Sequence, residues 1–163
     1  MGSRPTTAAL LVTLSVAAAS GVAARAASDL PAKRVDATIS SWRARVGRGP
    51  LSAVRKRELL RQVVRSAEAV AASAHARVSF RRATVYGGTR GPAIYLDLVT
   101  DAPARLLRHG RPLVRALTPY FGGWAIRLRD RRGGTVWIAG FGGSSGFVWS
   151  RPDLDRLSPV AHW

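Results

Sequence analysis

The chain has 163 residues, and its 26 lysines and arginines outweigh nine acidic residues to give a formal net charge of +17. It contains no cysteine, which excludes disulfide bonds, thiolate metal sites and a lipid-modified N-terminal cysteine. All but two of the basic residues are arginines, and arginine and alanine codons are GC-rich. The charge therefore fits a high-GC bacterial genome as well as a polyanionic partner.

The first 26 residues have the pattern of a secretory signal peptide. Arg4 supplies the positive region, residues 8–19 are apolar, and residues 24–26 (ARA) form a small-x-small cleavage site. We expect cleavage after Ala26, which lowers the net charge from +17 to +15 because the segment holds two arginines and no acids. The protein is then secreted or extracytoplasmic. The alternative is an uncleaved membrane anchor, since residues 8–24 approach the length of a spanning helix.

Two helices are expected before the first strand. Residues 28–47 carry an apolar stripe and a basic opposite face, so this helix either packs on the domain or lies on a membrane surface. A longer helix is expected over residues 52–73. We divide the chain into a signal peptide (1–26), an amphipathic helix with its linker (27–50) and a single α+β domain (51–163). The stripe of the first helix comprises Val35, Ile39, Trp42 and Val46, and the apolar face of the second comprises Leu60, Val63, Val64, Ala67, Val70 and Ala71.

The pattern then changes to the alternation of strands. Residues 78–86 and 94–99 flank a glycine-rich turn and predict a hairpin. A helix is expected to start at residues 100–103, with Asp101 as its cap, and to break near Gly110. A second hairpin follows, and a short fifth strand is a candidate. The second hairpin covers residues 124–128 and 136–140, and the fifth strand covers residues 147–149.

This element order predicts an α+β fold. Because hairpins imply antiparallel pairing, we expect a single antiparallel sheet of four to five strands with the helices packed on one face. The order α-α-β-β-α-β-β, with or without the fifth strand, resembles the profilin-like, roadblock-like and PAS-like architectures in topology alone. The chain carries no sequence motif of those families, and a shared topology does not imply a shared function.

One motif matches the nucleophile elbow of α/β-hydrolases. The sequence G-x-S-x-G is centred on Ser144, and Asp153 or Asp155 and then His162 follow in the order of that family. Ser144 would be the nucleophile, His162 the base and an aspartate its orienting group. However, an elbow needs a helix directly after the serine, whereas the residues that follow have the pattern of a strand. We therefore expect a hairpin loop and keep these residues as weak catalytic candidates.

Other catalytic arrangements have little support in the sequence. Asp97 and Asp101 are a conceivable pair for glycoside hydrolysis, yet a strand position and a helix cap explain them. His75, His109 and His162 lack metal-ligand spacing, so no metal is expected. No glycine-rich loop joins a strand to a helix, so no cofactor is expected. The sequence favours a binding protein over an enzyme.

Two groups of arginines are the candidate binding residues. By their spacing, Arg108, Arg111 and Arg115 share one helix face. Arg127 and Arg129 share the strand face opposite an apolar set. If helices cover only the apolar face, these two arginines are solvated, and Arg127→Ala should change stability by no more than about 0.5 kcal/mol. The apolar set, expected to be buried, comprises Leu96, Leu98, Trp124, Ile126 and Leu128.

A solvated cationic face would hold an anionic envelope polymer or an acidic lipid surface. Export makes nucleic acid an unexpected partner, and the alternative is a solvated face in an arginine-biased protein. We therefore expect a small exported, non-catalytic binding or sensor-like module of the cell envelope or extracellular space. The second hypothesis is a cationic structural protein that holds anionic polymer or lipid, and the third is a small serine hydrolase.

Overall fold

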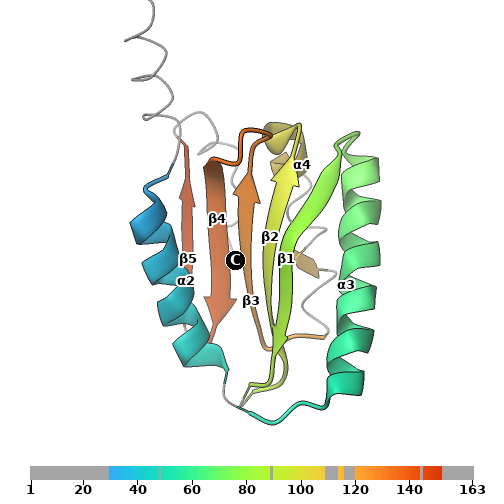
Figure 1. The fold of residues 1–163 in the computed structure, drawn as a ribbon, viewed down its shortest axis with the longest axis vertical. Coiled ribbons are helices and arrows are strands. Elements are labelled where there is room, and N and C mark those ends of the chain that lie inside the picture. Colours follow the sequence, from blue (N-terminus) through green and yellow to red (C-terminus); the bar gives the residue numbers. More distant parts are fainter. Residues whose placement is uncertain are drawn as a thin grey trace, which may run out of the picture.

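Figure 1 shows a computed structural model of the chain, which describes residues 30–47, 49–88, 90–108, 114–115, 120–143 and 145–151. The expected signal peptide lies outside these residues. The helices are α2 (Ala32–Val46), α3 (Ala53–Ser73) and α4 (Pro103–Arg108). Within the described ranges, no helix is both long enough and apolar enough to cross a bilayer.

Five strands form one sheet and follow one another across it in sequence order. The α+β class and the single sheet are therefore confirmed. Three neighbouring pairs are antiparallel, but β2 and β3 are parallel, so the expectation of a wholly antiparallel sheet is wrong at this pair. The segment between them contains α4 and acts as a crossover that brings the chain back to the end where β2 began. The strands are β1 (Val78–Tyr86), β2 (Ala93–Thr100), β3 (Gly123–Arg129), β4 (Thr135–Gly142) and β5 (Ser145–Ser150).

Helices α3 and α4 cover one face of the sheet with the larger hydrophobic core. The α3 helix begins after Ser52, whose hydroxyl accepts a hydrogen bond from the Arg55 N–H at 3.2 Å. Its buried residues recur every four positions: Val63, Ala67 and Ala71 are buried as predicted, and Leu59, which was not in the predicted face, is buried with them. The predicted Leu60 and Val70 pack partly buried against the same core. The apolar strand set is buried in this core as predicted. It comprises Leu96, Leu98, Trp124, Ile126 and Leu128.

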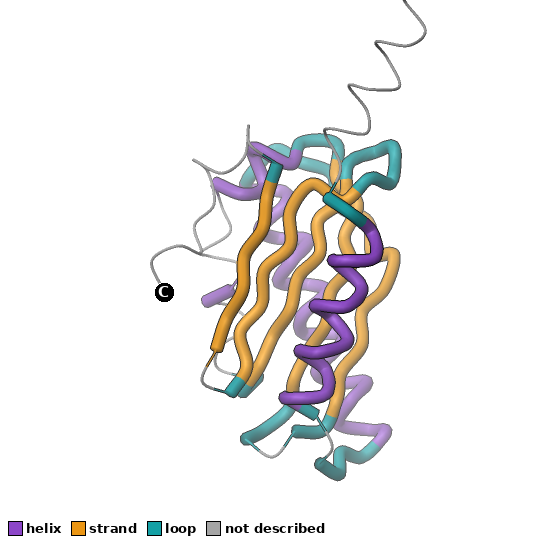
Figure 2. The backbone as a smooth tube through the Cα atoms, turned by 90° about the vertical axis from the view of Figure 1, so that its left-hand side faces the viewer, coloured by secondary structure: helices purple, strands orange, loops and turns teal. Residues whose placement is uncertain are grey.

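Helix α2 covers the opposite face, where it lies over β3 and β4 (Figure 2). Its predicted stripe packs on the sheet, with Trp42 fully buried and its indole N–H donating to the Phe141 carbonyl oxygen at 3.0 Å. Small strand residues permit this close approach, since a Cβ at Gly142 would overlap the Val46 side chain. Helices thus cover both faces, and the expectation that all of them pack on one face is wrong.

Strand β1 contains a bulge. Phe80 pairs with Leu98 and Arg82 pairs with Asp97, so Arg81 is an extra residue between them. The strict alternation expected along this strand therefore breaks. Phe80 and Val85 both pack against the larger core, whereas Arg82 shares the face of α2. The bulge places two consecutive arginines at the edge of the sheet beside the uncovered part of that face.

Candidate functional site

Charged and polar side chains gather on the α2 side of the sheet. Arg82 of β1, Asp97 of β2 and Arg127 of β3 are register partners, so they form one row across three strands. The neighbouring position on β2 is Tyr95, which is buried on the same face. A sheet face that carries such a row needs paired charges or access to water, because an unpaired buried charge is costly.

Arg127 meets this requirement by joining the sheet to α2. Its Nη1 lies 2.9 Å from Asp36 Oδ1 on α2, and its Nε donates to Thr135 Oγ1 on β4 at 2.7 Å. The Arg127 side chain is 9% exposed, whereas that of Asp36 is 67% exposed. The prediction that Arg127 is solvated is therefore wrong, although its strand face was assigned correctly. The charge is buried because α2 brings a carboxylate to it.

Arg129 and Asp97 form a second, more deeply buried pair. The Nε and Nη2 atoms of Arg129 donate to the two oxygens of Asp97 at 2.7 Å and 3.1 Å, and Nη1 donates to the Gly133 carbonyl oxygen at 2.8 Å. The side chain of Arg129 is 12% exposed and that of Asp97 is 8% exposed. Burial lowers the pKa of Arg129, but the bonds and charge of Asp97 outweigh it and raise the pKa above its ordinary value. Arg129 is thus a fixed cation and is not the solvated residue that we expected.

Tyr95 completes the buried polar cluster. Its hydroxyl donates to Asp97 Oδ2 at 3.4 Å. Burial, followed by the negative charge of Asp97, raises the pKa of Tyr95 from 10.0 to about 12. The phenol therefore stays protonated at neutral pH and acts there as a hydrogen-bond donor.

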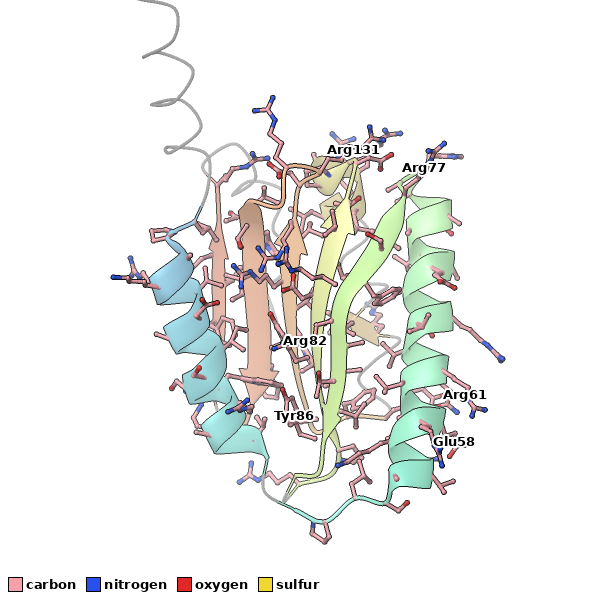
Figure 3. All side chains as sticks on the ribbon, viewed as in Figure 1. Glu58, Arg61, Arg77, Arg82, Tyr86 and Arg131 are labelled. Carbon is pink, nitrogen blue, oxygen red and sulfur yellow. The ribbon has the colours of Figure 1, made fainter. Side chains whose placement is uncertain are left out.

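A cleft of about 450 Å³ opens above this cluster, between α2 and β1. Arg43 of α2 lines one wall, Arg81 and Arg82 of β1 line the other, and the paired charges form the floor. In Figure 3, Arg82 and Tyr86 lie over the part of the sheet between β1 and α2. Five arginines line the cleft against two aspartates, so its field attracts anions.

The wall arginines differ from those of the floor. Arg43, Arg81 and Arg82 are exposed, and within the part of the chain that the structure describes none of them forms an ion pair. Their guanidinium groups can donate two hydrogen bonds to a carboxylate or phosphate without first breaking a bond within the protein. The floor arginines would have to release an aspartate to do the same. The wall groups are therefore the ones available to a ligand.

The other predicted arginines do not join this cleft. Arg108 and Arg115 are exposed and lie outside its lining, while Arg111 lies outside the described residues. Arg108 belongs to α4, which packs against the opposite face of the sheet. Arg108 thus belongs to the side of the sheet opposite Arg127 and Arg129.

The hydrolase candidates Ser144, Asp153 and His162 lie outside the described residues. Strand β5 begins at Ser145, so a strand follows the serine where an elbow requires a helix. Among the described residues, no group of three histidine, aspartate or glutamate side chains could hold a metal ion.

Asp101 has a structural role other than the expected helix cap. Its Oδ1 accepts the Arg77 N–H at 2.8 Å, and its Oδ2 lies 3.2 Å from Arg131 Nη2. The Arg77 N–H bond is the main cause that lowers the pKa of Asp101. A glycosidase needs one carboxyl group whose pKa is raised so that it can donate a proton. Asp101 therefore does not suit that acid role, and Asp97 is already bound to Arg129.

Sequence reasoning missed the cleft because its walls come from distant segments. Arg43 lies in the first predicted helix, with its basic face, and Arg81 lies in the first predicted strand, and no local pattern joined them. The best sign of the cleft in the sequence was that Tyr95 and Asp97 lie together on the strand face opposite the apolar residues. The chain matches no known family model, no curated protein and no solved structure. The resemblance to profilin-like, roadblock-like and PAS-like architectures thus remains one of element order.

Proposed function

We propose that this chain is a small exported, non-catalytic binding module of the cell envelope or extracellular space, and that the cleft between α2 and β1 binds an organic anion. The observation that carries the proposal is the set of exposed arginines on facing walls, Arg43 opposite Arg81 and Arg82, above a floor whose charges are already paired. A volume of about 450 Å³ suits a small organic ligand better than a simple ion.

The floor supports binding more than catalysis. Both carboxylate oxygens of Asp97 accept hydrogen bonds from Arg129, and Tyr95 keeps its proton well above neutral pH. Such groups orient a ligand but supply neither a free base nor a ready acid at neutral pH. The fixed ion pairs hold the cleft in one shape, which lowers the entropic cost of binding.

Calorimetric titration of the purified chain with carboxylates and phosphate monoesters tests the proposal. Arg43→Gln and Arg82→Gln should each weaken binding about tenfold or more, because each removes a hydrogen bond to a charged group. Arg57→Gln, an exposed arginine of α3 outside the cleft, is the matched control and should leave binding unchanged. Equal losses in all three variants would show a general charge effect and overturn the assignment of the cleft.

The second candidate, a structural protein that holds anionic polymer, draws on exposed arginines outside the cleft, such as Arg57 and Arg61 on one face of α3. A salt series separates the two functions. Polymer binding through dispersed charges should weaken steeply as salt rises, whereas binding in the cleft should depend on salt much less.

Export has its own test. The mature protein recovered from culture supernatant or envelope should begin near Ala27, as measured by N-terminal sequencing or intact mass. Recovery of the chain from Met1 in the membrane fraction would favour an uncleaved anchor instead.

A further inference from the structure

We infer that the ligand of the cleft is an acidic carbohydrate, meaning a polyhydroxylated molecule that also carries carboxylate or phosphate groups. This inference rests on the proposed function and adds the chemical class of the ligand. It comes from the acceptors that line the cleft among its arginines, which a simple anion would not use.

The acceptors come from α2, the helix that also carries Arg43. Asp36 Oδ1 is held by Arg127, but the carboxylate is largely exposed, and no hydrogen bond of its Oδ2 is found among the described residues. Ser40, one helical turn further, also lines the cleft and is exposed. A carboxylate repels a phosphate or a dicarboxylate, so a site built only for charge would do better without Asp36. A sugar hydroxyl, by contrast, donates to it.

The remaining lining suits the body of a sugar. Ile39 of α2 and Tyr86 of β1 supply apolar surface at the cleft. Tyr86 is held by an edge-on contact with Trp42, with ring centroids 6.2 Å apart. Pyranose rings present apolar C–H faces beside hydroxyl groups, and the cleft offers apolar surface beside free acceptors. The arginines of both walls then bind the acidic groups.

Four probes that separate charge from hydroxyl groups test this inference on the full chain. Digalacturonate carries both, its dimethyl ester carries hydroxyls alone, glutarate carries charge alone, and inorganic phosphate reports simple anion binding. We expect digalacturonate to bind at least about tenfold more tightly than glutarate or the ester, since either partial probe lacks one set of contacts.

Asp36→Ala should change the affinities in opposite directions. Digalacturonate should bind about tenfold more weakly because an acceptor is lost, while glutarate and phosphate should bind equally well or more tightly because a negative charge leaves and Arg127 is freed. Ser40→Ala, a smaller change on an exposed helix position, should weaken digalacturonate about threefold and leave glutarate unchanged. Ser40→Ala keeps the test valid if loss of the Asp36 pair destabilises α2.

The outcomes separate the inference from the proposed function. If Asp36→Ala strengthens binding of every anionic probe, or if digalacturonate binds no better than glutarate, the cleft is a simple anion site and the inference is overturned. In that case, Arg43→Gln and Arg82→Gln still weaken all anionic probes and the proposed function stands. If no probe binds, or if those two variants leave binding unchanged, both fail.

Discussion

The two faces of the sheet differ in what holds them. The face under α3 and α4 is a continuous apolar core, in which Leu96 and Ile126 are almost completely buried. The face under α2 holds a small apolar patch around Trp42 and, beside it, two ion pairs at the floor of an open cleft. Alternate residues of the same strands thus lie in two environments: one set belongs to the apolar core and the other lines the cleft.

The difference has an energetic consequence. Apolar burial is non-directional and tolerates small shifts, whereas a buried ion pair is stable only while both partners keep their geometry. We therefore expect substitutions on the apolar face to lower stability through lost volume, and substitutions on the α2 face to lower it through uncompensated charge.

The largest loss of stability is expected from a substitution on the α2 face. Arg129→Ala leaves the Asp97 carboxylate, 8% exposed, without its partner and should lower the free energy of unfolding by about 3–5 kcal/mol, measured by urea denaturation. The double variant Asp97→Leu/Arg129→Met removes both charges and should recover most of that loss. A double variant as unstable as Arg129→Ala would show that packing, and not charge, decides this position.

The second largest loss of stability is expected on the apolar face. Leu96→Ala should lower the free energy of unfolding by about 2–5 kcal/mol through lost transfer energy and the cavity left behind, measured in the same denaturation series. Its side chain is fully buried between the sheet and the helices. The binding affinity of the remaining folded protein should not change, because Leu96 faces away from the cleft. A change in affinity would contradict the separation of the two faces.

The strands and their apolar phase followed from the sequence because a period of two assigns each side chain to a face. This reasoning failed on β1, where the extra residue Arg81 changes the phase without a local sign. It also failed for β2 and β3, since residue patterns do not state in which direction a chain returns after a helix. In retrospect, the length of the segment between Thr100 and Gly123 indicated a crossover.

The charged site was beyond prediction for a different reason. Arg127 was expected in solvent because helices were expected to cover only the apolar face of the sheet, and its partner Asp36 lies 91 residues away in the chain. Small residues on the same face, such as Ala125 and Gly142, were the overlooked sign that something packs closely there. Pairing between distant segments depends on the fold, so a local pattern can suggest a covered face but cannot name its partners.

Arg127→Ala should have an intermediate effect. We expect a loss of about 1–3 kcal/mol, because hydrogen bonds to a charged group are removed while the exposed Asp36 regains water. Urea denaturation checks the value, and Arg129→Ala in the same series supplies the comparison with a buried partner. A loss within about 0.5 kcal/mol would restore the view of Arg127 as a surface residue.

The pH dependence of stability tests the burial of Tyr95 on the α2 face. Because its pKa is about 12 in the folded protein against 10.0 ordinarily, the folded state binds more protons than the unfolded state between these values. The free energy of unfolding should therefore fall as pH rises from 10 to 12, and Tyr95→Phe should remove this part of the decline. Denaturation at several pH values and absorbance titration at tyrosinate wavelengths measure it. Normal titration of every tyrosine in the folded protein would contradict burial of the Tyr95 hydroxyl.

The smallest effect on stability is expected at the cleft wall. Arg82 is exposed and forms no ion pair within the described residues, so Arg82→Ala should change the free energy of unfolding by no more than about 0.5 kcal/mol. Arg57→Ala, exposed on α3, should be equally mild. The two variants should differ in affinity for organic anions, since only Arg82 lines the cleft. If Arg82→Ala instead destabilises the fold as much as Arg127→Ala, Arg82 pairs with Asp97 in its row and belongs to the scaffold, which leaves the cleft one free cation fewer.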